Sequence, residues 1–147
     1  MGGLIPELRE FLDGQPVGVL ATTAPDGYAR QSLVYFARDD DRLLISTLAD
    51  RLKARDVRRT GWASLCVMGH EPPYPSATLS GPAEVLTEAI AGPTSMIARR
   101  ITPSTVPPEP ITDEMLASAG RVVLAITVER VSASNYIPTS ASGEANR

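Results

Sequence analysis

Hydrophobic residues near the start of the chain recur first at the spacing of a helix and then at that of a strand. Leu4, Leu8 and Leu12 lie four residues apart and Gly14 is a typical helix stop, so we predict a helix in this segment. Residues 17–23 form a short apolar run that is rich in β-branched side chains. This run indicates the first strand.

Clusters of turn residues separate the next strands. The Ala-Pro-Asp-Gly sequence at residues 24–27 has strong turn chemistry, and residues 28–37 predict a second strand that forms a hairpin with the first. Charged residues at 38–42 form another turn before an apolar segment at 43–47. We therefore expect a three-stranded meander in the first third of the chain.

The rest of the chain alternates between strands and short helices. Apolar or alternating segments predict three more strands, at residues 63–68, 77–86 and 121–132. Helices are expected at the end of the segment 49–59, over 87–101 with a break at Gly92-Pro93, and over 112–119. Proline-dense loops are expected at residues 69–75 and 103–110.

Six predicted strands joined by few helices indicate a mainly β protein, a small β-barrel, and argue against a doubly wound parallel sheet. The chain of 147 residues suits one domain. We place this domain at residues 1–138. The small, polar tail at residues 139–147 is expected to be disordered.

Composition excludes several classes of site. Cys66 and His70 are the only residues of their kinds, which excludes a disulfide, a Cys-rich zinc site and a metal site with two or three histidines, so no metal is expected. The formal charge of −3 and the aromatic content of 5% argue against nucleic-acid binding. Neither a secretory signal nor a membrane-spanning run is visible, so we expect a cytoplasmic protein without a membrane or nucleic-acid partner.

The most informative segment is a basic run in an acidic chain. Five of the nine residues at 51–59 are cationic, and the one lysine, Lys53, is among them. Cations packed this closely repel one another, so an anionic partner would stabilise them. The hydroxyls of Ser46 and Thr47 and the free N–H groups at the start of the next helix would complete a phosphate site.

Helical spacing sets a condition on this site. Within a helix, Arg51 and Lys53 would point to nearly opposite sides. Both can reach one phosphate only if the chain at Arg51 is still extended and the helix begins near Lys53. The other interpretation of the run is a solvated basic face that forms ion pairs with Asp50 and Asp56.

Several short motifs follow one another in an order typical of one family. They are VGVLAT at 17–22, Asp-Gly at 26–27, SLV at 32–34, RLKARDVRR at 51–59, GPAEV at 81–85 and RVV at 121–123. In their order and spacing, over nearly the whole length, the chain resembles the pyridoxamine 5′-phosphate oxidase-like split β-barrel superfamily. Within that superfamily it most resembles the actinobacterial branch that uses the deazaflavin coenzyme F420.

This resemblance implies a homodimer with two cofactor sites at the subunit interface. It places the cofactor phosphate against Ser46, Thr47, Arg51, Leu52, Lys53 and Arg55. It places the cofactor ring along Arg30, Gln31, Ser32, Leu33 and Val34. A loop of the other subunit would reach the same site with Tyr74, Pro75, Ser76 and Ala77.

The expected activity follows from that cofactor. We expect an F420-dependent oxidoreductase that transfers hydride to a small organic acceptor and needs no protein nucleophile. One alternative is an FMN-dependent flavin oxidoreductase, because both cofactors carry a phosphate on a ribityl chain. Another is a non-catalytic binder of a cofactor or tetrapyrrole, in which His70 would be the axial ligand.

Three other positions carry expectations of their own. Asp56 stands where the F420 branch usually has Asn, and a carboxylate beside a phosphate is unfavourable, so we expect Asp56 to face Arg59 or solvent. Cys66 lies in an apolar strand and is expected to be a buried small hydrophobe. Phe36 and Trp62 are expected to pack in the core or in an interface.

Overall fold

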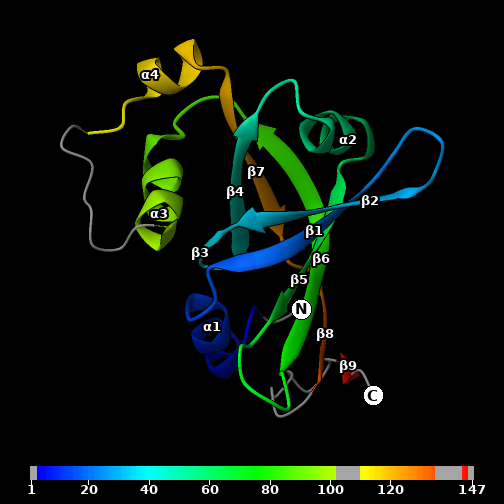
Figure 1. Ribbon diagram of the computed structural model, residues 1–147. Helices are drawn as coiled ribbons and strands as arrows, with labels where there is room; N and C mark the ends of the chain where they lie inside the picture. The colour runs from blue at the N-terminus through cyan, green and yellow to red at the C-terminus, as the bar shows by residue number, and fades with distance from the viewer. Residues whose placement is uncertain (1–2, 102–109, 135–143, 146–147) are drawn as a thin grey trace.

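The computed structural model describes residues 3–101, 110–134 and 144–145, which form a curled, mainly antiparallel sheet with helices around it (Figure 1). The helices are α1 (Pro6–Asp13), α2 (Leu52–Thr60), α3 (Ala91–Ile101) and α4 (Asp113–Ser118). The strands are β1 (Val17–Thr23), β2 (Ala29–Tyr35), β3 (Ala37–Asp39), β4 (Arg42–Leu48), β5 (Trp62–Met68), β6 (Ser76–Leu86), β7 (Arg121–Thr127), β8 (Arg130–Ser134) and β9 (Glu144–Ala145). The predicted fold class, a mainly β protein with a small β-barrel and few helices, is confirmed, and the curled sheet forms a half-barrel.

The sheet opens at one place because the predicted second strand bends. Neighbouring strands follow the order β2-β1-β5-β6-β7-β4-β3, and β8 lies beside β6. The chain bends at the fully buried Phe36, so that β2 pairs with β1 whereas β3 pairs with β4. The predicted three-stranded meander is therefore wrong in its pairing, since β4 takes β7 as its other neighbour. The two end strands of the sheet, β2 and β3, are joined at Phe36 and do not pair with each other, and we call this interruption of the strand pairing the split. Figure 1 shows β2 crossing β4 at an angle.

The predicted strand at 121–132 is likewise two strands, because the chain crosses closely over β6. Between β7 and β8, the N–H of Glu129 donates to the carbonyl of Ser80 at 2.9 Å. A Cβ atom at Gly81 would lie 1.9 Å from the carbonyl oxygen of Thr127, so this crossing requires glycine. β7 pairs with the last residues of β6, and β8 pairs with its first residues.

Two hydrophobic cores explain why β4 and β7 are apolar at nearly every position. One face of these strands lies inside the barrel with Leu43, Ile45, Leu124 and Ile126. The other face packs against α3 and α4 through Leu44, Val123 and Ala125. Strands that are covered on both faces lose the alternation of a half-exposed sheet.

The helices agree with the sequence, apart from the start of α3. The predicted helix at 87–101 begins at Ala91, so Gly92 and Pro93 lie in its first turn, where proline is tolerated, and they do not break it. The loop at 103–110 lies almost wholly outside the described residues, as does most of the tail from 139. The described residues 144–145 form β9, which pairs in parallel with β8. None of the described helices has both the length and the apolar character needed to cross a bilayer.

The expectation that Cys66 is buried is wrong. Cys66 is exposed on β5, opposite Val19 of β1 and Thr78 of β6. Its two neighbours in sequence, Leu65 and Val67, take the buried face of the strand. A two-residue period decides which side of a strand is covered, and an apolar run alone does not reveal that period.

Candidate functional site

The basic run begins outside a helix and continues into it. After β4 ends, the N–H of Arg51 donates to the carbonyl of Leu48 at 3.1 Å. Arg51 has extended backbone angles, φ −68° and ψ 150°, and α2 starts at Leu52. The predicted condition, an extended chain at Arg51 with the helix beginning near Lys53, is therefore met.

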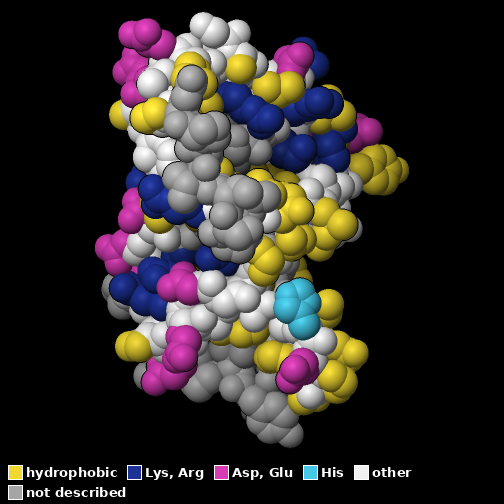
Figure 2. All heavy atoms as spheres, turned by 60° about the vertical axis from the view of Figure 1, so that its left-hand side comes forward, with side chains coloured by type: hydrophobic (Ala, Val, Ile, Leu, Met, Phe, Trp, Pro, Cys, Tyr) yellow, Lys and Arg dark blue, Asp and Glu magenta, His cyan; other side chains and the backbone are white. Residues whose placement is uncertain are grey.

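Two of the five cations tie α2 to the barrel. Arg58 donates from Nη1 to the carbonyl of Ala49 at 2.8 Å, and Arg59 donates to the carbonyl of Thr23. Within the described residues, the side chains of Arg51, Lys53 and Arg55 have neither a hydrogen bond nor an ion pair. Lys and Arg side chains gather across the upper part of the face shown in Figure 2. The run thus divides into structural arginines and cations that are available to a ligand.

The Asp56 carboxylate is buried in the fold, where it forms ion pairs with Arg30 and Arg59. Its side chain is only 1% exposed. It accepts hydrogen bonds from Thr22 Oγ1 and Arg30 Nε, both at 2.8 Å, and from Arg59 Nη1 at 3.2 Å. The hydrogen bond from Arg30, followed by those from Thr22 and Arg59, lowers the pKa of Asp56 to about 2, against the effect of burial. The expected contact with Arg59 is present, and this carboxylate is not free to compete with a phosphate for the other cations.

An open hollow of about 430 Å³ lies in the split of the sheet, between β2, β4 and α3; we call it the split hollow. Most of its lining is apolar and consists of Leu33, Val34, Tyr35, Ile97, Ala98 and Ile101. The polar part of the lining consists of Ser46, Lys53, Thr94 and Arg121. A mainly apolar lining with a few polar groups is typical of small-molecule sites.

The structure brings four of the predicted site residues together at this hollow, namely Leu33, Val34, Ser46 and Lys53. Thr47 is separated from Ser46, because alternation along β4 turns its side chain into the barrel, where it is 6% exposed. Arg51, Leu52 and Arg55 are exposed around the same part of α2 but do not line the hollow.

The remaining predicted residues on β2 lie along the strand, away from the hollow's lining. Gln31 is exposed and Ser32 is half-buried. Arg30 is engaged with Asp56, and this ion pair raises the pKa of Arg30. Its guanidinium therefore holds β2 against α2.

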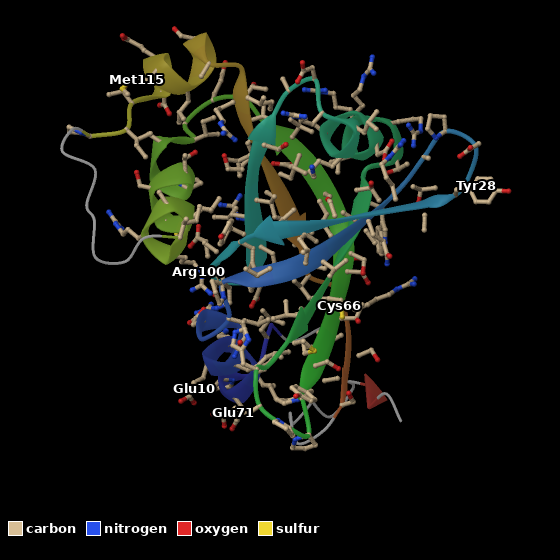
Figure 3. The ribbon with its side chains drawn as sticks, viewed as in Figure 1. Glu10, Tyr28, Cys66, Glu71, Arg100 and Met115 are labelled. Carbon is tan, nitrogen blue, oxygen red and sulfur yellow. The ribbon has the colours of Figure 1, made fainter. Side chains whose placement is uncertain are left out.

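The predicted loop residues 74–77 do not line the split hollow of their own chain. The loop that carries Glu71 and Tyr74 is near α1, at the end of the barrel away from α2 (Figures 1 and 3). The carbonyl of Pro75 accepts a hydrogen bond from Gly69, and the hydroxyls of Ser76 and Ser134 are 2.9 Å apart. One chain does not bring this loop to its own split hollow, so a role for Tyr74, Pro75, Ser76 and Ala77 in a partner's site stays a prediction.

Sequence reasoning missed the α3 and β7 sides of the hollow. Thr94, Ile97 and Ala98 follow one face of α3, and this helical spacing is visible in the sequence. The spacing does not show which strands this face of α3 covers. Arg121 could have been noticed as a cation directly before an aliphatic strand, but only the pairing of β7 with β4 places it here.

Comparison with known proteins then assigns the family. Residues 4–135 match the model of the family described as pyridoxamine 5′-phosphate oxidase. The chain belongs to the pyridoxamine 5′-phosphate oxidase family. The split β-barrel expected for this family agrees with the bend at Phe36 and the opening beside it. No curated protein matches the chain.

Solved structures of similar fold extend over most of the chain. A conserved hypothetical protein from Mycobacterium tuberculosis has a TM-score of 0.73 and 23% identity, with 90% of this chain and 87% of that chain covered. A protein described as an F420 reductase has a TM-score of 0.68 and 24% identity, with 86% and 98% covered. An FAD-binding protein from Mesorhizobium loti has a TM-score of 0.62 and 23% identity, with 83% and 87% covered. At these identities the likeness concerns the fold.

Proposed function

We propose that the chain is a coenzyme F420-dependent oxidoreductase that transfers hydride to a small organic acceptor. The observation that carries this proposal is the division of the basic run, which leaves Arg51, Lys53 and Arg55 without partners among the described residues and puts Lys53 at the split hollow. The order of the sequence motifs resembles the F420 branch of the family, and one structure of similar fold is described as an F420 reductase.

The residues present fit an organic phosphate that carries a flat ring. Lys53 and Ser46 supply a cation and a hydroxyl on one side of the hollow, and Asp56 is already neutralised by Arg30 and Arg59. Apolar side chains of β2 and α3 supply the surface that a ring would cover. Hydrogen bonds from charged donors to a phosphate are stronger than those from neutral donors.

In the proposed reaction, α2, β2 and α3 would each contribute differently to cofactor binding. Lys53 donates to the phosphate and fixes its position, with Arg51 and Arg55 adding positive potential around the start of α2. The family resemblance implies that the segment of β2 at residues 30–34 runs along the ring, and Leu33 and Val34 are the residues of this segment that line the hollow. Ile97 and Ala98 on α3 exclude water from that side. When bound, the reduced deazaflavin supplies the hydride, and the protein holds the acceptor close to it.

A second copy of the chain would complete this site. The split hollow is open, and Leu33 and Tyr35, which line it, are 76% and 46% exposed. Both belong to an exposed apolar face of β2, β1 and β5, so an interface on that face would also cover the hollow. The predicted homodimer, with the loop around Tyr74 reaching the partner's site, accounts for both features.

The direct test is titration of the purified protein with F420 and, separately, with FMN, followed by absorbance and fluorescence. We expect saturable binding of F420, and oxidation of the reduced coenzyme when a small activated alkene or carbonyl compound is added. Tighter binding of FMN would assign the site to a flavin. Binding of F420 without turnover of any acceptor would instead indicate a carrier.

Substitution of Lys53 tests the phosphate site itself. Lys53→Ala should raise the Kd for F420 by about tenfold to a hundredfold, as expected for loss of one charged hydrogen bond, while the thermal unfolding midpoint stays within a few degrees. Arg99→Ala, which removes an exposed cation outside the hollow, is the matched control and should leave the Kd unchanged. Equal affinities for Lys53→Ala and the unmodified chain would refute the phosphate role.

A further inference from the structure

Arg121 is a cation at the split hollow that does not belong to the basic run. It is the first residue of β7 and lies opposite Leu48, the last residue of β4, in the strand register. The N–H of Ala49 donates to the carbonyl of Gly120 at 2.9 Å, which fixes the start of β7 beside the turn that leads into α2. Arg121 and the start of the basic run are therefore held together by backbone contacts, although they are far apart in the sequence.

Alternation along β7 gives Arg121 the same face as Ser46. Ser46 pairs with Val123, so the two side chains share a face, and Arg121 lies two residues before Val123 on that face. This is the face that α3 covers, through the contact of Val123 with the second core. Ser46, Lys53 and Arg121 accordingly line one hollow from three different elements.

Most arginines of the described chain have a partner, and Arg121 has none there. Arg9, Arg30, Arg38 and Arg42 form ion pairs with aspartates, Arg58 and Arg59 hold carbonyls, and Arg100 does the same. Within the described residues, Arg121 has neither a hydrogen bond nor an ion pair. It shares this property with Lys53, and both side chains line the hollow.

We propose that Arg121 is an anion-binding residue of the split hollow, which holds the phosphoryl group of the ligand together with Lys53. The proposal rests on the proposed function and adds a residue from the far end of the chain to its phosphate site. A guanidinium offers a planar pair of donors that match two phosphate oxygens, whereas the ammonium of Lys53 acts as a point charge. Two cations from separate elements balance the charge of a phosphate better than one.

The test combines residue substitution with removal of the phosphoryl group from the ligand. Kd values are measured for FMN against riboflavin, and for F420 against its deazaflavin precursor that lacks the phosphoryl tail. Arg121→Gln should weaken the phosphorylated ligand of each pair by about tenfold and leave its phosphate-free counterpart within about twofold. Arg121→Lys should recover part of that loss, and Arg99→Gln, which removes an exposed α3 cation outside the hollow, should change neither ligand.

A second arm uses inorganic phosphate, followed by chemical-shift titration of the backbone amides. In the unmodified chain, phosphate should shift the amides of residues 46–53 and 121, and Arg121→Gln should weaken this binding severalfold. An equal loss for phosphorylated and phosphate-free ligands, or an unchanged phosphate affinity, would overturn the role of Arg121. If Lys53→Ala alone weakens the phosphorylated ligands, the proposed function survives and only the inference about Arg121 fails. If neither coenzyme binds but Arg121→Gln weakens the binding of inorganic phosphate, Arg121 is an anion-binding residue and the proposed function fails.

Discussion

At the scale of single residues, Asp56 belongs to the basic segment in sequence, but its carboxylate is bound inside the fold and does not line the split hollow. Asp56 accepts from Thr22, Arg30 and Arg59 and is almost fully buried. It thereby joins β1, β2 and α2 through one side chain. Burial of a charge is costly unless it is paired and hydrogen-bonded, and here all three donors come from within the fold.

Replacement of Asp56 should destabilise the protein in a manner that depends on pH. Asp56→Asn leaves two arginines without their carboxylate, and we expect a loss of roughly 2 to 3 kcal/mol at pH 7 in urea unfolding. The folded-state pKa of Asp56 is about 2, below its ordinary value of 3.8. Its contribution is therefore fully present above pH 4 and disappears as the pH falls toward 2. The difference in unfolding free energy between the two proteins should shrink over that interval.

Asp50→Asn is the matched control, because Asp50 is an exposed carboxylate in the turn before α2. This variant should unfold within about 0.5 kcal/mol of the unmodified chain at every pH. A constant gap between Asp56→Asn and the unmodified chain from pH 7 to pH 2 would contradict the assigned titration.

The sequence located the basic run but could not divide it. Clustering of charge is a local property, and it pointed to the segment that contains Lys53. Contacts between distant segments decide which cations are structural. Examples are the contacts of Arg59 with Thr23 and of Arg30 with Asp56. For the same reason the sequence predicted only that Asp56 faces either Arg59 or solvent. The structure shows the contact with Arg59.

At the scale of elements, one arginine joins α3 to α1, in addition to the apolar packing of α3 on β4 and β7. Arg100 donates from Nη1 to the carbonyl of Asp13 at 2.9 Å, and from Nη2 to the carbonyls of Leu12 and Gln15. Its guanidinium also lies 5.3 Å from the ring centre of Phe36. Arg100 thus joins α3 to the end of α1 and to the bend that opens the split (Figure 3). Because α3 forms a wall of the split hollow, this contact also shapes the site.

Removal of that contact should loosen α3. Arg100→Met keeps much of the apolar stem but leaves the carbonyls at the end of α1 without their donor, and we expect a loss of about 2 to 3 kcal/mol in unfolding free energy. Amide hydrogen exchange should speed up in residues 91–101 more than in β4 or β7. Arg99→Met, on the exposed side of the same turn, should have little effect. Unchanged exchange in α3 would show that its apolar contacts alone hold it.

Elements and their pairing differ in how far the sequence predicts them. Helical and strand periods are local, so α1, β1, β5 and β6 appear near their predicted positions. Pairing is a long-range property, and the expected meander failed because the bend at Phe36 sends β3 to the other end of the sheet. The split hollow depends on that bend and on α3, so it could not be predicted from the basic run.

At the scale of the whole molecule, one face of the sheet carries exposed apolar side chains in the described part of the chain. Val19 lies between Leu33 and Cys66 in the strand register, and both of these neighbours are exposed. Met68 and Tyr35 extend the same face. Exposed apolar surfaces of this kind are typical of interfaces, and Leu33 and Tyr35 also line the split hollow. The proposed association with a second copy would therefore cover both this surface and the split hollow.

A charge in the middle of that face should separate the protomers. Val19→Asp places a carboxylate between Leu33 and Cys66, where a partner's apolar surface would have to desolvate it. In sedimentation velocity we expect the unmodified chain at twice its mass of 15.6 kDa and the variant at 15.6 kDa, with a fall in F420 affinity because each hollow loses its cover. Met115→Asp changes an exposed side chain of α4, outside the face formed by β2, β1 and β5 (Figure 3), and should stay dimeric. A monomeric unmodified chain that binds the coenzyme with full affinity would show that one protomer makes the whole site.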